Sequence, residues 1–110
     1  MSVEIVRNYF NKNEIQKEIL EFPVSSATVE LAAQAVGVEP ARIAKTLSFY
    51  TKEKDAAILI VTAGDMKIDN VKFKHYFGMK AKMLASEDVE RLTGHAIGGV
   101  CPFGNPKSTA

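Results

Sequence analysis

Residues 27–50 read ATVELAAQAVGVEPARIAKTLSFY and predict two helices followed by a strand. Apolar side chains repeat at helical spacing up to Gly37, which supplies a C-terminal stop, so a helix is expected over Ala27 to Val36. A proline suits the first position of a short second helix, Glu39 to Ala44. The β-rich residues Lys45 to Tyr50 then predict a strand that begins at or just before Lys45.

Further elements are expected on both sides of this stretch. They are a helix from Ser2 to Asn11, a short strand from Gln16 to Phe22, a strand from Ala56 to Ala63 covered on both faces, a helix around Ile68 to Phe77, a short strand around Lys80 to Leu84, and a helix opened by Ser86 and closed by Gly94. Interleaved helices and strands predict an α/β or α+β fold.

The composition fits one compact domain, because 46% of the 110 residues are hydrophobic and 25% are charged. Fourteen Lys and Arg against thirteen Asp and Glu leave a net charge of +1, which argues against strong attraction to a long nucleic-acid backbone. The N-terminus does not resemble a secretion signal, and the longest apolar run, Ala56 to Ala63, is too short to span a membrane. A soluble, cytoplasmic protein is expected.

Lys45 is the first candidate for a functional residue. In a strand it points to the same side as Leu47 and Phe49, which belong in a core. It either lies at the strand's end and extends to water, or anchors a phosphate or carboxylate beside a pocket.

The segment Gly94-His95-Ala96-Ile97-Gly98-Gly99-Val100-Cys101-Pro102-Phe103-Gly104 is the second candidate. Its glycines allow the backbone to approach a ligand and leave amide N–H groups that can hold a developing oxyanion. The same composition also occurs in plain turns, and the segment lacks the Lys-Ser/Thr ending of a P-loop. The chain stops soon after it, which suggests a truncated or alternatively ended form.

Cys101 is the only cysteine, so no intramolecular disulfide can form. With His95 nearby it could act as a thiol nucleophile, although a lone buried cysteine is the more common situation. One cysteine and two scattered histidines are a poor metal set, so a zinc site is rejected.

The middle of the chain is locally basic, with Phe73, Tyr76 and Phe77 interleaved among five lysines: Lys67, Lys72, Lys74, Lys80 and Lys82. This pattern usually indicates a solvated face over a core. It could also hold an RNA acceptor stem through a weak, salt-sensitive contact.

The helix-helix-strand stretch through Ile43-Ala44-Lys45-Thr46-Leu47, followed by Gly98-Gly99-Val100-Cys101-Pro102-Phe103-Gly104, resembles the YbaK and prolyl-tRNA-synthetase-associated editing-domain family of aminoacyl-tRNA deacylases. The family's invariant lysine corresponds to Lys45, and its Gly-x-x-x-Pro loop corresponds to Gly98 through Pro102. The resemblance covers residues 1–110 as a single editing domain and implies a mixed, barrel-like β-sheet flanked by helices. Related chains usually continue with further strands, so C-terminal elements are expected to be missing.

The resemblance also implies an activity, which is hydrolysis of the ester between a wrong amino acid and the terminal adenosine of tRNA, typically tRNA for proline. Lys45 would fix the substrate, and Gly98 and Gly99 would supply oxyanion donors. Since the 2′-hydroxyl of the adenosine can assist the attack, no protein nucleophile, metal or cofactor is required. An aminoacyl-tRNA synthetase is a possible partner, and the alternative is a tRNA- or synthetase-binding module without catalysis.

The amino-acid pocket is expected to involve hydroxyl groups from the region where family members line it, together with the glycine-rich segment. The candidate substrate-binding residues are Ser25, Ser26, Thr28, Thr46, Val100, Cys101 and Pro102. The serines and Thr28 could equally be helix caps.

Overall fold

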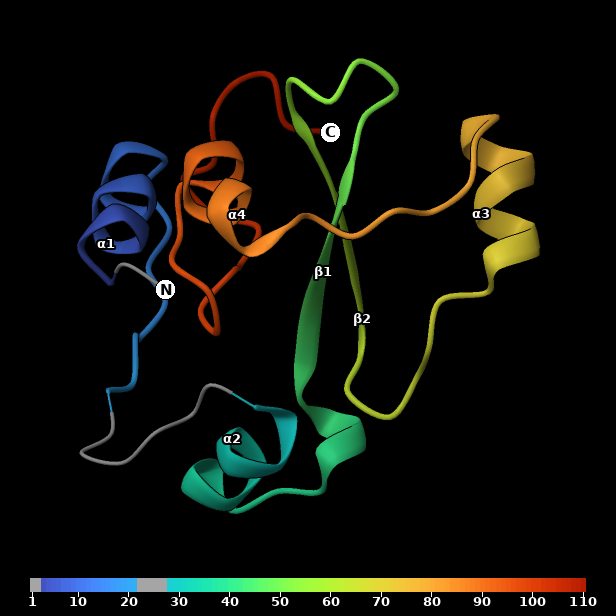
Figure 1. The fold of residues 1–110 in the computed structure, drawn as a ribbon. Helices are drawn as coiled ribbons and strands as arrows, with labels where there is room; N and C mark the ends of the chain where they lie inside the picture. The colour runs from blue at the N-terminus through green and yellow to red at the C-terminus, as the bar shows by residue number, and fades with distance from the viewer. Residues whose placement is uncertain (1–2, 22–27) are drawn as a thin grey trace.

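A computed structural model of the chain describes residues 3–21 and 28–110. Its elements in chain order are helices α1 (Val3–Lys12) and α2 (Val29–Val36), the 3-10 helix η1 (Pro40–Arg42), strands β1 (Ala44–Tyr50) and β2 (Ala57–Ala63), and helices α3 (Asn70–Phe77) and α4 (Ser86–Thr93). Figure 1 shows the two strands as a central hairpin, with α3 and α4 on opposite sides of it. The expected α+β class is confirmed.

The hairpin is antiparallel, with a register that runs from Ala44 opposite Ala63 to Tyr50 opposite Ala57. Side chains alternate between its two faces. One face packs on α3 through Phe49, Ile58 and Phe73. The other packs on α4 through Tyr50, Ala57 and Leu92. The hairpin therefore separates two small cores.

In the described residues the sheet has these two strands and is wholly antiparallel, so the mixed, barrel-like sheet implied by the resemblance is not formed there. β2 was also expected to be covered on both faces, which is wrong for its second half. Val61 is 51% exposed, and Ala63 is exposed as well. An apolar run alone does not reveal how many elements will cover it.

Two other expected strands differ from the structure. Residues 16–21 form no strand; Glu18 and Glu21 are exposed, and Phe22 lies outside the described residues. The segment around Lys80 to Leu84 contributes one isolated bridge, Phe49 with Met83. The short helix expected over Glu39 to Ala44 is the single 3-10 turn η1.

The ends of the helices show which capping signals were read correctly. Thr28 is the N-cap of α2, and its Oγ1 accepts a hydrogen bond from the Leu31 N–H at 3.2 Å. Gly37 ends α2 with φ of 81°. Ser86 does not cap α4, because the N-cap position is Ala85 and has no side-chain cap.

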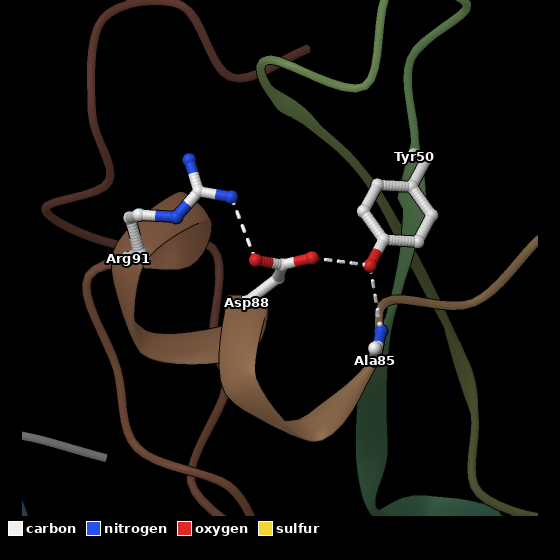
Figure 2. A network of polar contacts seen from close by, with 4 residues as sticks. All are labelled: Tyr50, Ala85, Asp88 and Arg91. Atoms are coloured by element: carbon white, nitrogen blue, oxygen red, sulfur yellow. Dashed lines mark hydrogen bonds and ion pairs between the residues drawn. The ribbon is translucent and has the colours of Figure 1, made fainter.

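A polar network replaces the missing cap of α4 (Figure 2). The Tyr50 hydroxyl accepts a hydrogen bond from the Ala85 N–H at 3.0 Å and donates one to Asp88 Oδ2 at 2.5 Å. Arg91 pairs with the other oxygen of Asp88 at 2.6 Å. Since Tyr50 ends β1, the network ties the start of α4 to the strand.

The C-terminal residues pack back onto the rest of the domain. Phe103 meets Phe10 of α1 edge to face, with ring centroids 5.0 Å apart. Ala110 exchanges backbone hydrogen bonds with β2, donating to Ala57 O at 3.0 Å and accepting from Leu59 N at 2.8 Å. Among the described helices, none combines the length and apolar character needed to cross a membrane.

Candidate functional site

Lys45 lies on β1 opposite Thr62, and its side chain is half-buried. Its Nζ donates a hydrogen bond to the carbonyl oxygen of Gly64, 3.2 Å away, just beyond the end of β2. An ammonium group has three donors, and this bond uses one of them. The ammonium is therefore held at the end of the hairpin with donors remaining for an anionic or carbonyl group.

Gly64 is a site residue that the sequence reasoning missed. A Cβ atom here would come within 2.3 Å of Pro40 O, 2.6 Å of Val29 Cγ1 and 2.9 Å of Ile43 O. A larger residue would displace the end of β2 from α2 and η1. The glycine therefore allows the close packing that sets the position of the Lys45 acceptor. A glycine directly after an apolar strand was the available signal.

The alternation of β1 assigns Lys45 and Thr46 to opposite faces. Lys45 continues the face of Leu47 and Phe49, which packs on α3. Thr46 lies opposite Val61 and is half-buried. A ligand bound on the α3 face would therefore contact the Lys45 side chain, whereas the Thr46 hydroxyl belongs to the opposite face.

The glycine loop, Gly98–Pro102, follows α4 and contains one left-handed residue, Gly98, with φ of 81°. The N–H of Gly99 donates to Ala96 O at 3.0 Å, within the turn itself. In the described part of the chain, the N–H groups of Gly98, Val100 and Cys101 have no acceptor. The expectation that Gly99 supplies an oxyanion donor is thus not supported in this conformation, whereas the three neighbouring amides have no acceptor within the described residues.

Two polar side chains, the buried His95 and the half-buried Asn105, hydrogen-bond to the backbone in and around the glycine loop. His95 is fully buried, and its Nε2 lies 2.8 Å from Phe103 O. Asn105 Nδ2 donates to Cys101 O at 3.0 Å and to Thr93 O at 2.7 Å. These bonds connect the residues before and after the loop, so its backbone has a defined shape.

Cys101 does not form a catalytic pair with His95. The Cys101 Sγ lies 3.4 Å from His95 Nε2. That nitrogen must carry a proton, because its nearer partner is the carbonyl of Phe103, which can only accept. It therefore cannot take the thiol proton. Burial also raises the pKa of the Cys101 thiol, which favours the protonated, less reactive form.

The other predicted substrate residues are scattered. Thr28 serves as the cap of α2, Val100 is half-buried, and Pro102 is exposed. Ser25 and Ser26 lie outside the described residues. Within residues 3–21 and 28–110, no hydrogen bond or ion pair joins Lys45 to the glycine loop. The two strongest candidates are thus separately positioned parts of the domain.

Residues 24–109 match the model of the aminoacyl-tRNA editing domain, so the chain belongs to this family. The match includes both Lys45 and the glycine loop. The fold is therefore that of an editing domain, and the matched range contains both candidate parts of the site.

Three relatives show how the domain occurs elsewhere. An uncharacterised protein of Bacillus subtilis, YwhH, is 54% identical over 94% of this chain and 66% of its own length. The proline--tRNA ligase of Caldicellulosiruptor bescii is 30% identical over 86% of this chain and 16% of its own length. The crystal structure of a candidate trans-editing enzyme for prolyl tRNA synthetase is 32% identical, with a TM-score of 0.86 over 98% of this chain and 68% of that one.

The chain thus spans just under two thirds of YwhH and less than a fifth of the ligase. The editing domain occurs both within a synthetase and in shorter proteins.

Proposed function

We propose that this chain deacylates misacylated tRNA in trans. Lys45 holds the aminoacylated end of the tRNA, and the glycine loop stabilises the negative charge that develops on the ester oxygen. The observation that carries the proposal is the match of residues 24–109 to the editing-domain family. The site chemistry supports it, since one positioned ammonium and a row of available amides suit an ester whose oxygen becomes negatively charged. tRNA for proline is the proposed substrate, because the relatives include proline--tRNA ligases, and the cytoplasm is the proposed location.

The reaction is the addition of water to the ester carbonyl carbon, followed by cleavage of the bond from that carbon to the ribose oxygen. The ribose oxygen takes a proton, and the amino acid leaves as a carboxylic acid. Negative charge develops on the carbonyl oxygen in the transition state, where fixed N–H donors are most effective. The amides of Gly98, Val100 and Cys101 are the proposed donors.

Lys45 is proposed to hold the substrate rather than to attack it. Its ammonium is fixed by the Gly64 carbonyl at 3.2 Å and retains donors for a phosphate or carbonyl of the terminal nucleotide. The 2′-hydroxyl of the terminal adenosine can assist the attack of water. With Cys101 buried and protonated, this division of roles requires no protein nucleophile.

A separate hydrolytic domain is needed because a synthetase pocket distinguishes small side chains poorly, by about 1–3 kcal/mol per methylene. Alanine, serine, threonine and cysteine are the small amino acids to test. The test is hydrolysis of tRNA for proline charged with each of them. Release of one amino acid well above the spontaneous rate supports the proposal. Binding of the charged tRNA without release would instead identify a non-catalytic binding module.

A further inference from the structure

Positive charge is concentrated in one segment of this nearly neutral chain. Residues 66–83 contain five lysines and one aspartate, whereas the remainder carries nine basic and twelve acidic side chains. The segment includes α3 and the chain that follows it. A ligand of high negative charge would be attracted to this region and repelled elsewhere.

The fold turns much of this charge outward. Phe73 is buried against Phe49, with ring centroids 4.9 Å apart, and the Phe77 ring packs at a tilt against Phe73, with centroids 4.5 Å apart. The aromatic stripe faces the hairpin, so the rest of α3 faces solvent. Tyr76 is 83% exposed and Val71 is 67% exposed.

A hollow of about 890 Å³ lies between α3 and the segment after it, and we refer to it as the lysine groove. It is lined by Asn70, Val71, Lys74, His75, Lys80 and Ala81. Lys74 and Lys80 come from its two walls. Groups that carry negative charge at regular intervals could therefore be held between them.

The lysines at the groove have no acidic partners in the part of the chain that the structure describes. The ion pairs there are Arg7 with Glu21 and Arg91 with Asp88. Lys82 differs from its neighbours, since its Nζ lies 5.8 Å from the centre of the Tyr50 ring. Within the described residues Lys74 and Lys80 thus form no ion pair and can pair with an external anionic ligand.

The groove also lies on the relevant side of the hairpin. α3 packs on the face formed by Leu47 and Phe49, which is the face that Lys45 continues. A substrate that rests on α3 would therefore lie on the same side of the hairpin as Lys45.

From these observations we propose that the lysine groove binds the phosphate backbone of the tRNA acceptor stem while the aminoacylated end lies at Lys45. The inference rests on the proposed function. Duplex RNA suits the groove because its recognition is mainly through phosphates and sugars, for which lysine ammonium groups are point-charge partners. The near-neutral total charge makes the contact local and salt-sensitive.

The test compares Lys74→Glu/Lys80→Glu with the matched control Lys52→Glu/Lys107→Glu, in which two exposed lysines elsewhere carry the same change. Two substrates are used, an aminoacylated minihelix of the acceptor stem and an aminoacylated CCA trinucleotide. The KM of each is measured over a series of salt concentrations. Binding of the uncharged minihelix is measured in parallel.

The groove variant is expected to raise the minihelix KM about tenfold or more and to lower the slope of log affinity against log salt by about 1 for each lysine. The groove variant should hydrolyse the trinucleotide as the wild type does. The control variant should keep the wild-type minihelix KM and salt dependence. A minihelix KM within twofold of wild type would overturn the inference, as would an equal loss on both substrates.

Failure of the proposed function is distinguishable from failure of this inference. If the wild type hydrolyses neither substrate, the deacylase assignment is wrong. Binding of the uncharged minihelix still tests the lysine groove in that case. Weaker and less salt-dependent binding by the groove variant, but not by the control variant, would support the docking surface even without catalysis. Equal binding by wild type and both variants would reject it.

Discussion

The Nε2 of His95 lies 2.8 Å from the carbonyl oxygen of Phe103, and this bond joins the residues on either side of the glycine loop. The His95 side chain is fully buried and so is shielded from solvent and from a bound substrate. The amides proposed to stabilise the oxyanion are therefore positioned by a histidine that does not touch the substrate. His95 is a positioning residue in this account.

His95→Ala should destabilise the fold by about 1–3 kcal/mol, because it empties a fully buried position and removes the hydrogen bond to the Phe103 carbonyl. It should also lower kcat more than it raises KM, since the loop donors act on the transition state. Urea unfolding and deacylation kinetics measure the two effects. His95→Gln, which keeps an N–H donor, should recover part of both. Full activity in a folded His95→Ala protein would contradict the positioning role.

Gly64→Ala should lower both stability and activity. The added Cβ would meet backbone oxygens of Pro40 and Ile43 at 2.3 and 2.9 Å, and such overpacking costs about 1–3 kcal/mol. The end of β2 must move, and with it the carbonyl that holds Lys45. Gly78→Ala is the control, since nothing lies within 4 Å of its Cβ and its cost comes from a φ of 70° alone. Deacylation kinetics should distinguish the two variants. The activity per folded molecule should fall in Gly64→Ala and stay at the wild-type level in Gly78→Ala.

Tyr50→Phe should change the acid stability of the domain. Hydrogen bonds from Tyr50 and then Arg91 lower the pKa of Asp88 below its ordinary 3.8. A lowered folded pKa gives stability that is present above the unfolded value and is lost as pH falls through the folded value. In Tyr50→Phe the hydroxyl is absent, so the pKa of Asp88 is lowered less. Thermal unfolding midpoints of wild type and variant should therefore converge as the pH falls below 3.8.

The same pair predicts a limit at high pH. The hydrogen bond to Asp88 raises the pKa of Tyr50 above its ordinary 10.0. The stability that this bond contributes is therefore present below pH 10.0 and is lost as the pH rises through the raised pKa of Tyr50. Midpoints that keep a constant difference at both extremes would contradict the network of Figure 2.

Cys101 should react slowly with iodoacetamide in the folded protein. Burial raises its pKa and hides the sulfur, so both thiolate content and access are reduced. Alkylation at mildly alkaline pH is expected to be about tenfold or more slower than for a model thiol, and to become equal in denaturant. Cys101→Ala should retain most of its deacylase activity. Rapid alkylation with parallel loss of activity would favour a thiol mechanism.

Local signals were sufficient for much of the fold. Gly37 ends α2 and the strand through Lys45 begins at Ala44, as predicted. The helix was expected from Ala27, whereas Thr28 is its N-cap, one of the two roles left open for that residue. These features depend on neighbouring residues alone. The expected strand at residues 16–22 was wrong over 16–21, because loose alternation is not enough without a partner strand to accept its hydrogen bonds.

The parts of the site that were missed depend on distant contacts. Ala85 caps α4 without a side-chain oxygen because the Tyr50 hydroxyl reaches it from 35 positions away. The Gly99 amide was predicted to face a substrate, yet its N–H donates a hydrogen bond to a carbonyl three residues earlier. His95 was considered a partner for the thiol, whereas its proton is committed to Phe103. Residue types alone do not reveal these pairings.

The most direct test of the central claim is single-turnover deacylation of mischarged tRNA for proline by wild type, Lys45→Met and Lys52→Met. Lys45→Met keeps most of the side-chain length and removes the ammonium, and Lys52→Met is the surface control. We predict hydrolysis by wild type and Lys52→Met, with loss of about a hundredfold or more in folded Lys45→Met, in line with the removal of one key polar contact at a reaction centre. Hydrolysis at the wild-type rate by Lys45→Met would contradict the account.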